Sequence, residues 1–134
     1  MKITLIRGLP GSGKSTYAKN NFNCAVLEAD MLCFQGGKYN WKKETSRSRH
    51  EATKEIAKFV LRFGADIVVC NTFTCLWEME PYFAMAKLFN ADVEVIKMCT
   101  MYASIHGVPE ETIRTMKERW EPFHGEIEIK DGAK

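Results

Sequence analysis

The sequence lacks the features that define several large classes of protein. It contains no apolar run near the ~20 residues that span a bilayer, and Met1 and Lys2 lead directly into a short strand-like run rather than a signal peptide. Its five cysteines are an odd number without CxxC spacing, which favours free thiols over a disulfide framework or a zinc ribbon. There is also no internal repeat and no low-complexity block. We therefore expect a cytoplasmic protein with no membrane partner.

The composition of the 134 residues is typical of one folded domain. Hydrophobic residues make up 46% and charged residues 27%, a balance that excludes disordered and collagen-like chains. A chain of this length can bury one ordinary hydrophobic core. We therefore expect a single domain over residues 1–134.

Positive charge is concentrated in the first half of the chain. Residues 1–67 carry 12 lysines and arginines against 6 acids, whereas residues 68–134 carry 7 against 11. The densest basic segment runs from Lys38 to Arg49 and includes Tyr39 and Trp41. Such a segment can bind a nucleic acid through phosphate contacts and base stacking, or it can simply be a solvated loop and helix start.

Short apolar runs alternate with helical segments along the chain. Strands are expected at residues 2–7, 24–28, 66–71 and 92–98, and helices at 14–21, about 48–63, 78–89 and 109–120. Residues 125–134 fit either an edge strand or a loose tail. This alternation predicts a three-layer α/β fold, with a mostly parallel sheet and helices on both faces.

The expected helix at about 48–63 has its own sequence signals. Ser48 and Glu51 have the spacing of a capping box, and Gly64 suits the C-terminal stop. Apolar residues recur with helical periodicity at Ala52, Ile56, Phe59, Val60 and Phe63. The pattern predicts an amphipathic helix.

The strongest functional signal is the nonapeptide GLPGSGKST at Gly8–Thr16. It fits the P-loop pattern GxxxxGK[ST] and lies between a predicted strand and a predicted helix, which is the context that supports such a match. The glycines let successive N–H groups point at phosphates, and the helix N-terminus adds partial positive charge. The predicted ATP-binding residues are Gly8, Leu9, Pro10, Gly11, Ser12, Gly13, Lys14, Ser15 and Thr16. Lys14 is expected to reach the β- and γ-phosphates, and Ser15 to hold Mg²⁺ through its hydroxyl.

Other residues narrow the class of P-loop protein. No guanine-reading NKxD follows the loop, and the chain is too short for a motor ATPase, so a small kinase remains. Such an enzyme needs a carboxylate near the acceptor hydroxyl and basic residues over the transferred phosphoryl group. Asp30, just after the second expected strand, fits the first need, although it also fits a helix N-cap. Arg114 and Arg119 fit the second, although they also fit a solvated helix face.

The motifs together resemble a known family, the P-loop kinase domain of bacteriophage-type 5′-polynucleotide kinases. The shared segments are GLPGSGKST, LEAD and the residues up to Phe34, KYNW, Asn71-Thr72, WEMEPY and HGVPEETIRTMKERWE, which together cover about residues 2–121. The resemblance implies an ATP-dependent kinase that uses Mg²⁺ and phosphorylates the 5′-hydroxyl of DNA or RNA, in the host cytoplasm if the source is a virus.

The resemblance also implies roles for individual residues. Asp30 would activate the 5′-hydroxyl, and a lid at about residues 100–121, followed by a tail at about 124–134, would supply an arginine to the phosphates. The lid arginine would be Arg119 or Arg114, of which Arg119 matches the family pattern better. Candidate substrate contacts are Arg47, Arg49, His50 and Asn71.

The sequence departs from the family where relatives place acidic or basic residues. Cys70 stands where many relatives have an aspartate before the Asn-Thr pair, so a Walker-B-like carboxylate is missing and Mg²⁺ would rely on Ser15, ATP oxygens, water and Asp30. Met31 and Cys33 replace a second acid and a basic residue. Two alternatives therefore stay open, namely a kinase for another hydroxyl (a modified base, a nucleoside or a small metabolite) and a non-catalytic nucleotide-binding module.

Overall fold

A parallel five-stranded sheet forms the centre of the molecule, which we describe from a computed structural model. The structure describes residues 1–28, 34–35, 38–39, 46–100 and 109–130. The strand order is β2-β5-β1-β6-β7, and every neighbouring pair in this sheet is parallel. β1 (Lys2–Arg7) occupies the middle, with β5 (Ile67–Asn71) on one side and β6 (Asp92–Met98) on the other. Ligands of such sheets bind beyond the carboxyl ends of the strands, at the point where the strand order reverses, which here is the end of β1.

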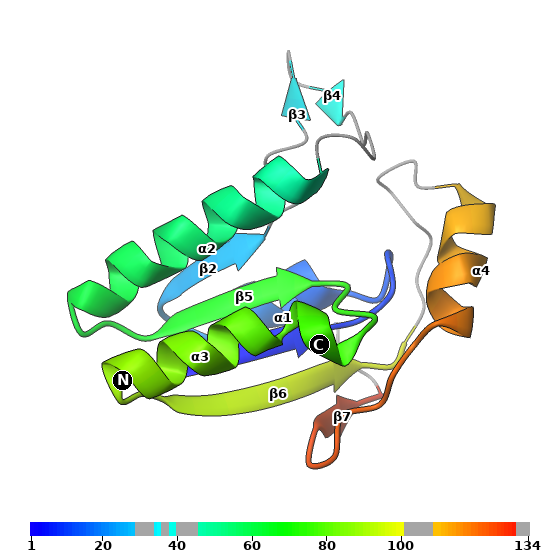
Figure 1. Ribbon diagram of the computed structural model, residues 1–134. Helices are drawn as coiled ribbons and strands as arrows, with labels where there is room; N and C mark the ends of the chain where they lie inside the picture. Colours follow the sequence, from blue (N-terminus) through cyan, green and yellow to red (C-terminus); the bar gives the residue numbers. More distant parts are fainter. Residues whose placement is uncertain (29–33, 36–37, 40–45, 101–108, 131–134) are drawn as a thin grey trace.

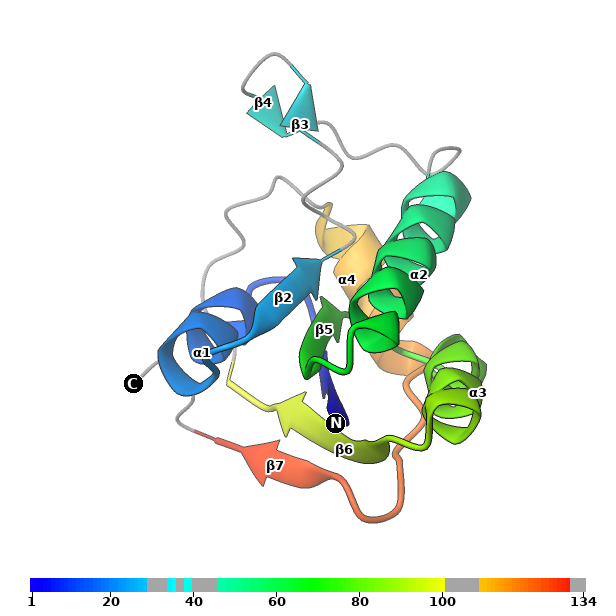
Figure 2. The same cartoon turned by 90° about the vertical axis from the view of Figure 1, so that its left-hand side faces the viewer.

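Helices cover both faces of this sheet, as the sequence predicts (Figure 1; Figure 2). α1 (Lys14–Asn21) lies on one face, beside β2 (Ala25–Glu28). α2 (Ser46–Arg62) and α3 (Glu80–Phe89) lie on the other, and a short 3₁₀ turn, η3 (Leu76–Glu78), precedes α3. α4 (Glu110–Glu118) stands beyond the carboxyl ends of the strands (Figure 1). The expected three-layer α/β fold is therefore confirmed.

Local sequence explains where several elements end. Gly64 adopts φ +75°, a conformation that favours glycine, and its N–H donates to the Leu61 carbonyl to close α2. Pro81 lies in the first turn of α3, where a missing N–H costs nothing, and Asn90 ends that helix in the left-handed conformation. β5 is buried along its whole length, as expected for a central strand covered on both faces.

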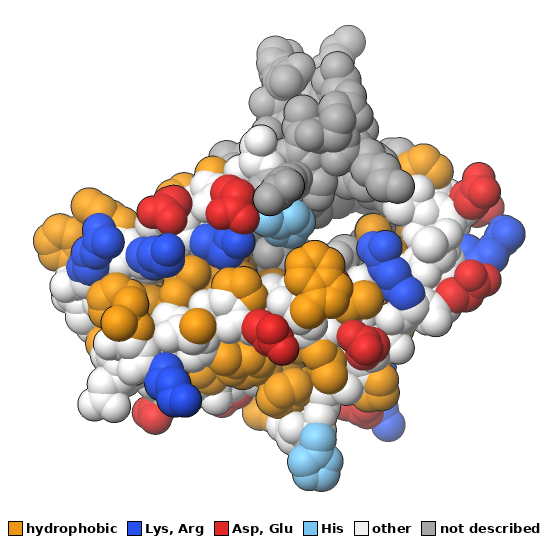
Figure 3. All heavy atoms as spheres, in the orientation of Figure 1, with side chains coloured by type: hydrophobic (Ala, Val, Ile, Leu, Met, Phe, Trp, Pro, Cys, Tyr) orange, Lys and Arg blue, Asp and Glu red, His pale blue; other side chains and the backbone are white. Residues whose placement is uncertain are grey.

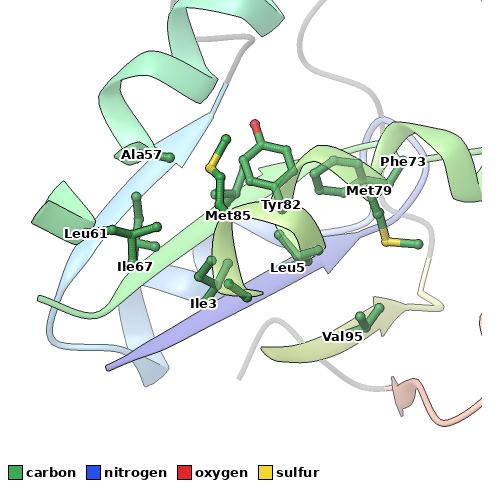
Figure 4. Packing of buried hydrophobic residues seen from close by; sticks show 12 residues of the cluster. Ile3, Leu5, Ala57, Leu61, Ile67, Phe73, Met79, Tyr82, Met85 and Val95 are labelled. Atoms are coloured by element: carbon green, nitrogen blue, oxygen red, sulfur yellow. The ribbon is translucent and has the colours of Figure 1, made fainter. Parts of the chain in front are cut away.

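Strand alternation divides the core into two clusters of unequal size. The larger cluster fills the face under α2 and α3 and includes Ile3, Leu5, Leu61, Tyr82 and Met85 (Figure 4). The smaller cluster lies under α1. Its buried members are Ile6, Ala18, Val68, Cys70, Ile96 and Met98.

Some local expectations differ from the structure. α2 begins at Ser46, so Ser48 lies inside the helix rather than at its cap. Ile56, Phe59 and Phe63 are exposed, because the face of α2 that meets the sheet is the one bearing Thr53, Ala57 and Leu61. The amphipathic periodicity therefore predicts the helix correctly, but it includes an apolar stripe that faces solvent.

The segment at 125–134, which fits two alternatives by sequence, contains an edge strand. β7 (Ile127–Ile129) pairs in parallel with β6 and extends the sheet. A two-residue hairpin is formed by β3 (Phe34–Gln35) and β4 (Lys38–Tyr39). Within the described residues, no helix is long and apolar enough to cross a membrane.

Candidate functional site

The loop Gly8–Thr16 connects the central strand β1 to α1, as the motif requires. Gly11 and Gly13 adopt φ +83° and +86°, which favour glycine and curl the backbone towards the start of α1. At Gly8 an added Cβ would collide with Ser12 Oγ and lie 3.1 Å from Met98 Cβ. The Ser12 hydroxyl is buried and makes no hydrogen bond. The backbone is thus held in a tight cradle whose N–H groups can receive phosphate oxygens.

Lys14 lies at the start of α1 with its ammonium group folded over the loop. Its Nζ donates to the Gly8 carbonyl at 2.9 Å and to the Leu9 carbonyl at 3.0 Å. Both acceptors belong to the phosphate-binding loop itself. A phosphate bound by Lys14 would therefore replace these neutral carbonyl contacts with stronger, charge-assisted contacts to an anion.

Ser15 contacts a carboxylate that the motif does not contain. Its Oγ donates to Oε2 of Glu28 at 2.9 Å. Glu28 is the last residue of β2 and is half-buried beside the N-terminus of α1. Hydroxyl and carboxylate oxygens are ligands that Mg²⁺ uses in proteins, so this pair fits the metal that a P-loop implies.

Cys70 is the register partner of Glu28 on the neighbouring strand β5. It is buried in the cluster under α1. Burial, followed by the nearby negative charge of Glu28, raises the pKa of the Cys70 thiol from 9.0 to about 12. Cys70 is therefore an uncharged thiol at neutral pH and supplies no carboxylate-like charge.

Arg7, the last residue of β1, links the strand before the P-loop to the chain that follows α4. Its guanidinium is fully buried and donates to the Phe73 carbonyl, the Glu121 carbonyl and, at 3.0 Å, the Glu126 carboxylate. The Trp120 ring lies 4.2 Å from the guanidinium carbon, within the range of a cation–π contact. Arg7 thus anchors the C-terminal end of α4 to the centre of the sheet.

The two candidate lid arginines occupy different positions on α4. Arg119 is the C-terminal cap of the helix, and its Nε donates to Thr74 Oγ1 at 3.0 Å. Arg114 lies in the middle of α4 and is exposed. The Arg119 side chain is therefore bonded to the loop after β5, whereas Arg114 projects into solvent.

The predicted substrate contacts lie at the same edge of the sheet. Arg49 and His50 lie in the N-terminal part of α2, which Figure 1 shows beyond the carboxyl end of β2. Asn71 is buried and ends β5, beside Arg7 in the strand register. The backbone of Arg47 lies in the first turn of α2, but its side chain and all of Asp30 lie outside the described residues.

The sequence analysis does not identify two residues of this site, Glu28 and Arg7. The only signal for each is a charged residue at the end of an apolar strand, in AVLE and KITLIR. A charge at such a position is compatible with solvent exposure, so the contact that makes it functional is visible only in three dimensions. Among the described residues, no group of three or more His, Cys, Asp and Glu side chains could hold a metal ion by itself.

The parallel sheet, the loop between β1 and α1 and the flanking helices define the chain as a P-loop kinase-like domain, a fold that implies nucleotide binding. A protein-family comparison agrees: residues 3–107 match the family model described as "AAA domain". The chain belongs to this family.

The chain is also similar to individual proteins and solved structures. The chain is 30% identical over 135 residues to human NEDD4-binding protein 2. The aligned region covers 90% of this chain but only 8% of that protein. The fold is similar to a sugar kinase from Janibacter sp., with a TM-score of 0.66 and 13% identity over 96% of this chain and 83% of the other. It is also similar to a chain of the Pnkp1/Rnl/Hen1 complex, with a TM-score of 0.58 and 16% identity over 85% of this chain and 38% of the other. Both structural similarities concern the fold alone.

Proposed function

We propose that this chain is an ATP-dependent kinase that transfers the γ-phosphoryl group to a hydroxyl on a nucleic acid, in particular a polynucleotide 5′-hydroxyl. The observation that carries the phosphotransfer part is the intact P-loop at the end of the central strand, with Lys14 and Ser15 at the start of α1. The resemblance of the whole motif set to polynucleotide kinases supports the acceptor.

The roles of this chain's residues follow from their positions and chemistry. Lys14 would bind the β- and γ-phosphates, and the N–H groups of Gly8–Thr16 would receive the remaining phosphate oxygens. Ser15 would hold Mg²⁺ through its hydroxyl, and the ion would neutralise negative charge on the phosphates. Asp30 would accept the proton of the acceptor hydroxyl, whose oxygen forms the new bond to phosphorus as ADP leaves.

The electrostatics of the first half support a polyanionic acceptor. His50 is half-buried near the N-terminal end of α2, at the edge of the sheet where the P-loop lies, whereas Arg49 beside it is buried. The net excess of basic residues in positions 1–67 adds attraction for a phosphate backbone. We therefore expect acceptor binding to weaken steeply as the salt concentration rises.

Two alternatives follow from specific observations. The first alternative is a kinase for a small hydroxyl compound, which is the acceptor class of a sugar kinase whose fold this chain shares. Cys70, which brings no negative charge to the end of β5, favours a nucleotide-binding module without phosphotransfer.

One experiment separates these functions. Transfer of radiolabelled γ-phosphate from ATP is measured with Mg²⁺ on 5′-hydroxyl oligonucleotides, modified-base DNA, nucleosides and simple sugars. Label on the 5′-hydroxyl oligonucleotide is expected, with loss in Lys14→Met and Asp30→Asn and retention in Lys19→Met, a matched change on the exposed face of α1. Label only on another acceptor would replace the substrate, and ATP binding without transfer to any acceptor would favour the non-catalytic module.

A further inference from the structure

We propose that Glu28 supplies the carboxylate of the magnesium site, from the strand next to the one that lacks it. This inference rests on the proposed nucleotide-binding function and names a residue that the P-loop motif does not include. It concerns the described contact between Ser15 on α1 and Glu28 at the end of β2.

The first step is the position of the two side chains. Glu28 and Cys70 are register partners on adjacent parallel strands, which lie about 4.8 Å apart in such sheets. A carboxylate at Glu28 therefore reaches nearly the same region as a carboxylate at Cys70 would. The contact with Ser15 shows that Glu28 points to the P-loop side of the sheet.

The second step is the distance between the two oxygens. Ser15 Oγ and Glu28 Oε2 are 2.9 Å apart. Two neighbouring ligands of an octahedral Mg²⁺ ion, each about 2.0–2.1 Å from the metal, are separated by about 2.9 Å. The two oxygens are therefore close enough to contact one Mg²⁺ ion together.

The third step is the charge at the site. Lys14, next to Ser15 in the chain, provides a positive charge, Glu28 in contact with Ser15 provides a negative one, and Cys70 provides none. Mg²⁺ in phosphate-binding sites is usually held by one or two carboxylates together with substrate phosphates. Within the described part of the site, Glu28 is the carboxylate in hydrogen-bond contact with Ser15.

The test measures nucleotide binding rather than turnover. The dissociation constant of a fluorescent ATP analogue is determined in EDTA and across a Mg²⁺ titration for the wild type, Glu28→Gln, Cys70→Asp and the double variant. We expect Glu28→Gln to need about tenfold more Mg²⁺ for the same affinity, whereas its affinity in EDTA should not fall, because the change removes a negative charge beside the phosphates. The double variant should regain Mg²⁺ sensitivity, because it moves the carboxylate to the adjacent strand.

Controls separate this role from folding and from the proposed function. Glu94→Gln removes a carboxylate on β6 that pairs with Lys2 away from the P-loop, and it should leave the Mg²⁺ titration unchanged. Circular dichroism is used to check that each variant is folded. An unchanged Mg²⁺ requirement in folded Glu28→Gln would overturn the inference. Mg²⁺-dependent ATP binding without phosphate transfer would remove the proposed kinase function but leave this inference standing, whereas no nucleotide binding by the wild type would remove both.

A separate feature of the molecule, the exposed apolar stripe on α2, supports a second inference. The stripe consists of Ala52, Ile56 and Phe59 on α2 and Phe63 in the turn directly after it, all exposed, with Phe59 at 59% and Phe63 at 76%. The rings of Phe59 and Phe63 contact each other edge to face, with centroids 5.1 Å apart. Large aromatic side chains clustered in contact with water are typical of interaction surfaces.

The spacing and the charges of α2 indicate what covers this stripe. Its members are separated by four, three and four residues, the spacing of a helix–helix seam. Glu55 and Arg62 flank the same side of the stripe, with the acid towards the N-terminus and the base towards the C-terminus. In an antiparallel pair of identical helices, Glu55 of each copy faces Arg62 of the other, whereas a parallel pair does not bring them together.

We infer that the stripe is a dimer interface, on which α2 of a second copy packs antiparallel around a two-fold axis. Such an interface is closed, because each copy presents the same surface to the other. Figure 3 shows charged side chains in rows along α2, with hydrophobic side chains beside them near the end of the helix. The seam is short, so we expect a dimer that dissociates on dilution.

Sedimentation over a concentration series tests this pairing. The wild type should approach twice the mass of one chain, and Phe59→Ser should weaken association by about tenfold or more. Ile127→Ser, which changes an exposed apolar residue of the edge strand β7 far from α2, is the control and should leave the mass unchanged. A wild type that stays monomeric at high concentration would overturn the inference.

Charge reversal tests the direction of pairing. Glu55→Arg and Arg62→Glu alone each place like charges opposite one another and should weaken the dimer. The double reversal restores opposite charges and should recover it. Failure of the double reversal to recover a dimer that each single change weakens would overturn the antiparallel arrangement.

Discussion

The two faces of the sheet serve different purposes. The face under α2 and α3 carries the larger core cluster, built from aromatic, aliphatic and methionine side chains. The face under α1 carries a smaller cluster and, at its carboxyl edge, the P-loop, Glu28 and the neutral thiol of Cys70. The larger core cluster therefore lies on one face and the candidate nucleotide site on the other, and substitutions on the two faces should separate stability from nucleotide binding.

Arg7→Met should lower the unfolding free energy as much as any core substitution, because the Arg7 guanidinium is fully buried and ion-paired with Glu126. Arg7→Met leaves the Glu126 carboxylate buried without its cation, and breaking such a buried pair costs about 3–5 kcal/mol of unfolding free energy. Urea denaturation measures this loss. Lys2→Met, which removes a more exposed ion pair with Glu94, should cost about 1 kcal/mol or less. Equal losses in the two variants would show that the Arg7 contacts contribute no more than a surface pair.

Leu5 and Ile6 provide a matched test of the two faces, since both are fully buried neighbours on β1. Leu5→Ala should cost about 3–5 kcal/mol and leave nucleotide affinity unchanged, because its side chain packs in the larger cluster. Ile6→Ala should cost about 2–3 kcal/mol and also weaken nucleotide binding, because it packs in the cluster under α1. Thermal denaturation and a fluorescent ATP analogue measure the two properties, and weaker nucleotide binding in Leu5→Ala alone would reverse the assignment of the faces.

Substitution of Ser12 should raise the unfolding free energy, whereas the substitutions of core residues lower it. Its buried hydroxyl has no hydrogen-bond partner, so Ser12→Ala should raise the unfolding free energy by about 1 kcal/mol. Differential scanning calorimetry without nucleotide detects this as a higher Tm. A lower Tm would show that the hydroxyl stabilises the empty loop.

Ionisation of the Cys70 thiol should have the smallest effect on the unfolding free energy at neutral pH. Because its folded pKa is raised to about 12, the thiol is protonated in both the folded and the unfolded state at pH 7. Above pH 9 the unfolded thiol ionises first, so the unfolding free energy should fall as the pH rises towards 12. Iodoacetamide labelling followed by mass spectrometry should modify the exposed Cys99 and spare Cys70 in the folded protein at pH 8. Rapid labelling of Cys70 would contradict its burial.

The sequence predicts the sheet and its helices because their signals are local. Alternating apolar runs, the P-loop motif and the stop at Gly64 each act over a few residues, and β1, α1, β5 and β6 lie where these signals indicate. The choice of buried face in α2 is not local, since Thr53 and Leu61 face the sheet while Phe59 faces solvent. Amphipathic periodicity locates a helix, but it does not show which apolar stripe meets the core.

The candidate site is predictable only in part for a related reason. The motif locates Lys14 and Ser15, and strand topology brings the ends of β1, β2 and β5 together. The contact of Ser15 with Glu28 depends on the register between β2 and β5, and the contacts of Arg7 depend on residues more than 60 positions away. Neither contact can be predicted from a short stretch of sequence.

The anchoring of α4 at one end has a mechanical consequence. Trp120 and Glu121 contact Arg7, and Arg119 is bonded to Thr74, so the C-terminal end of α4 is a fixed pivot. At about 1.5 Å per residue, Arg114 lies about 7.5 Å along the helix from Arg119, and Glu110 about 13.5 Å. Any swing about the pivot moves Glu110 nearly twice as far as Arg114, while Arg119 barely moves. A swing of α4 about this point would therefore displace Arg114, while the contact of Arg119 with Thr74 stayed in place.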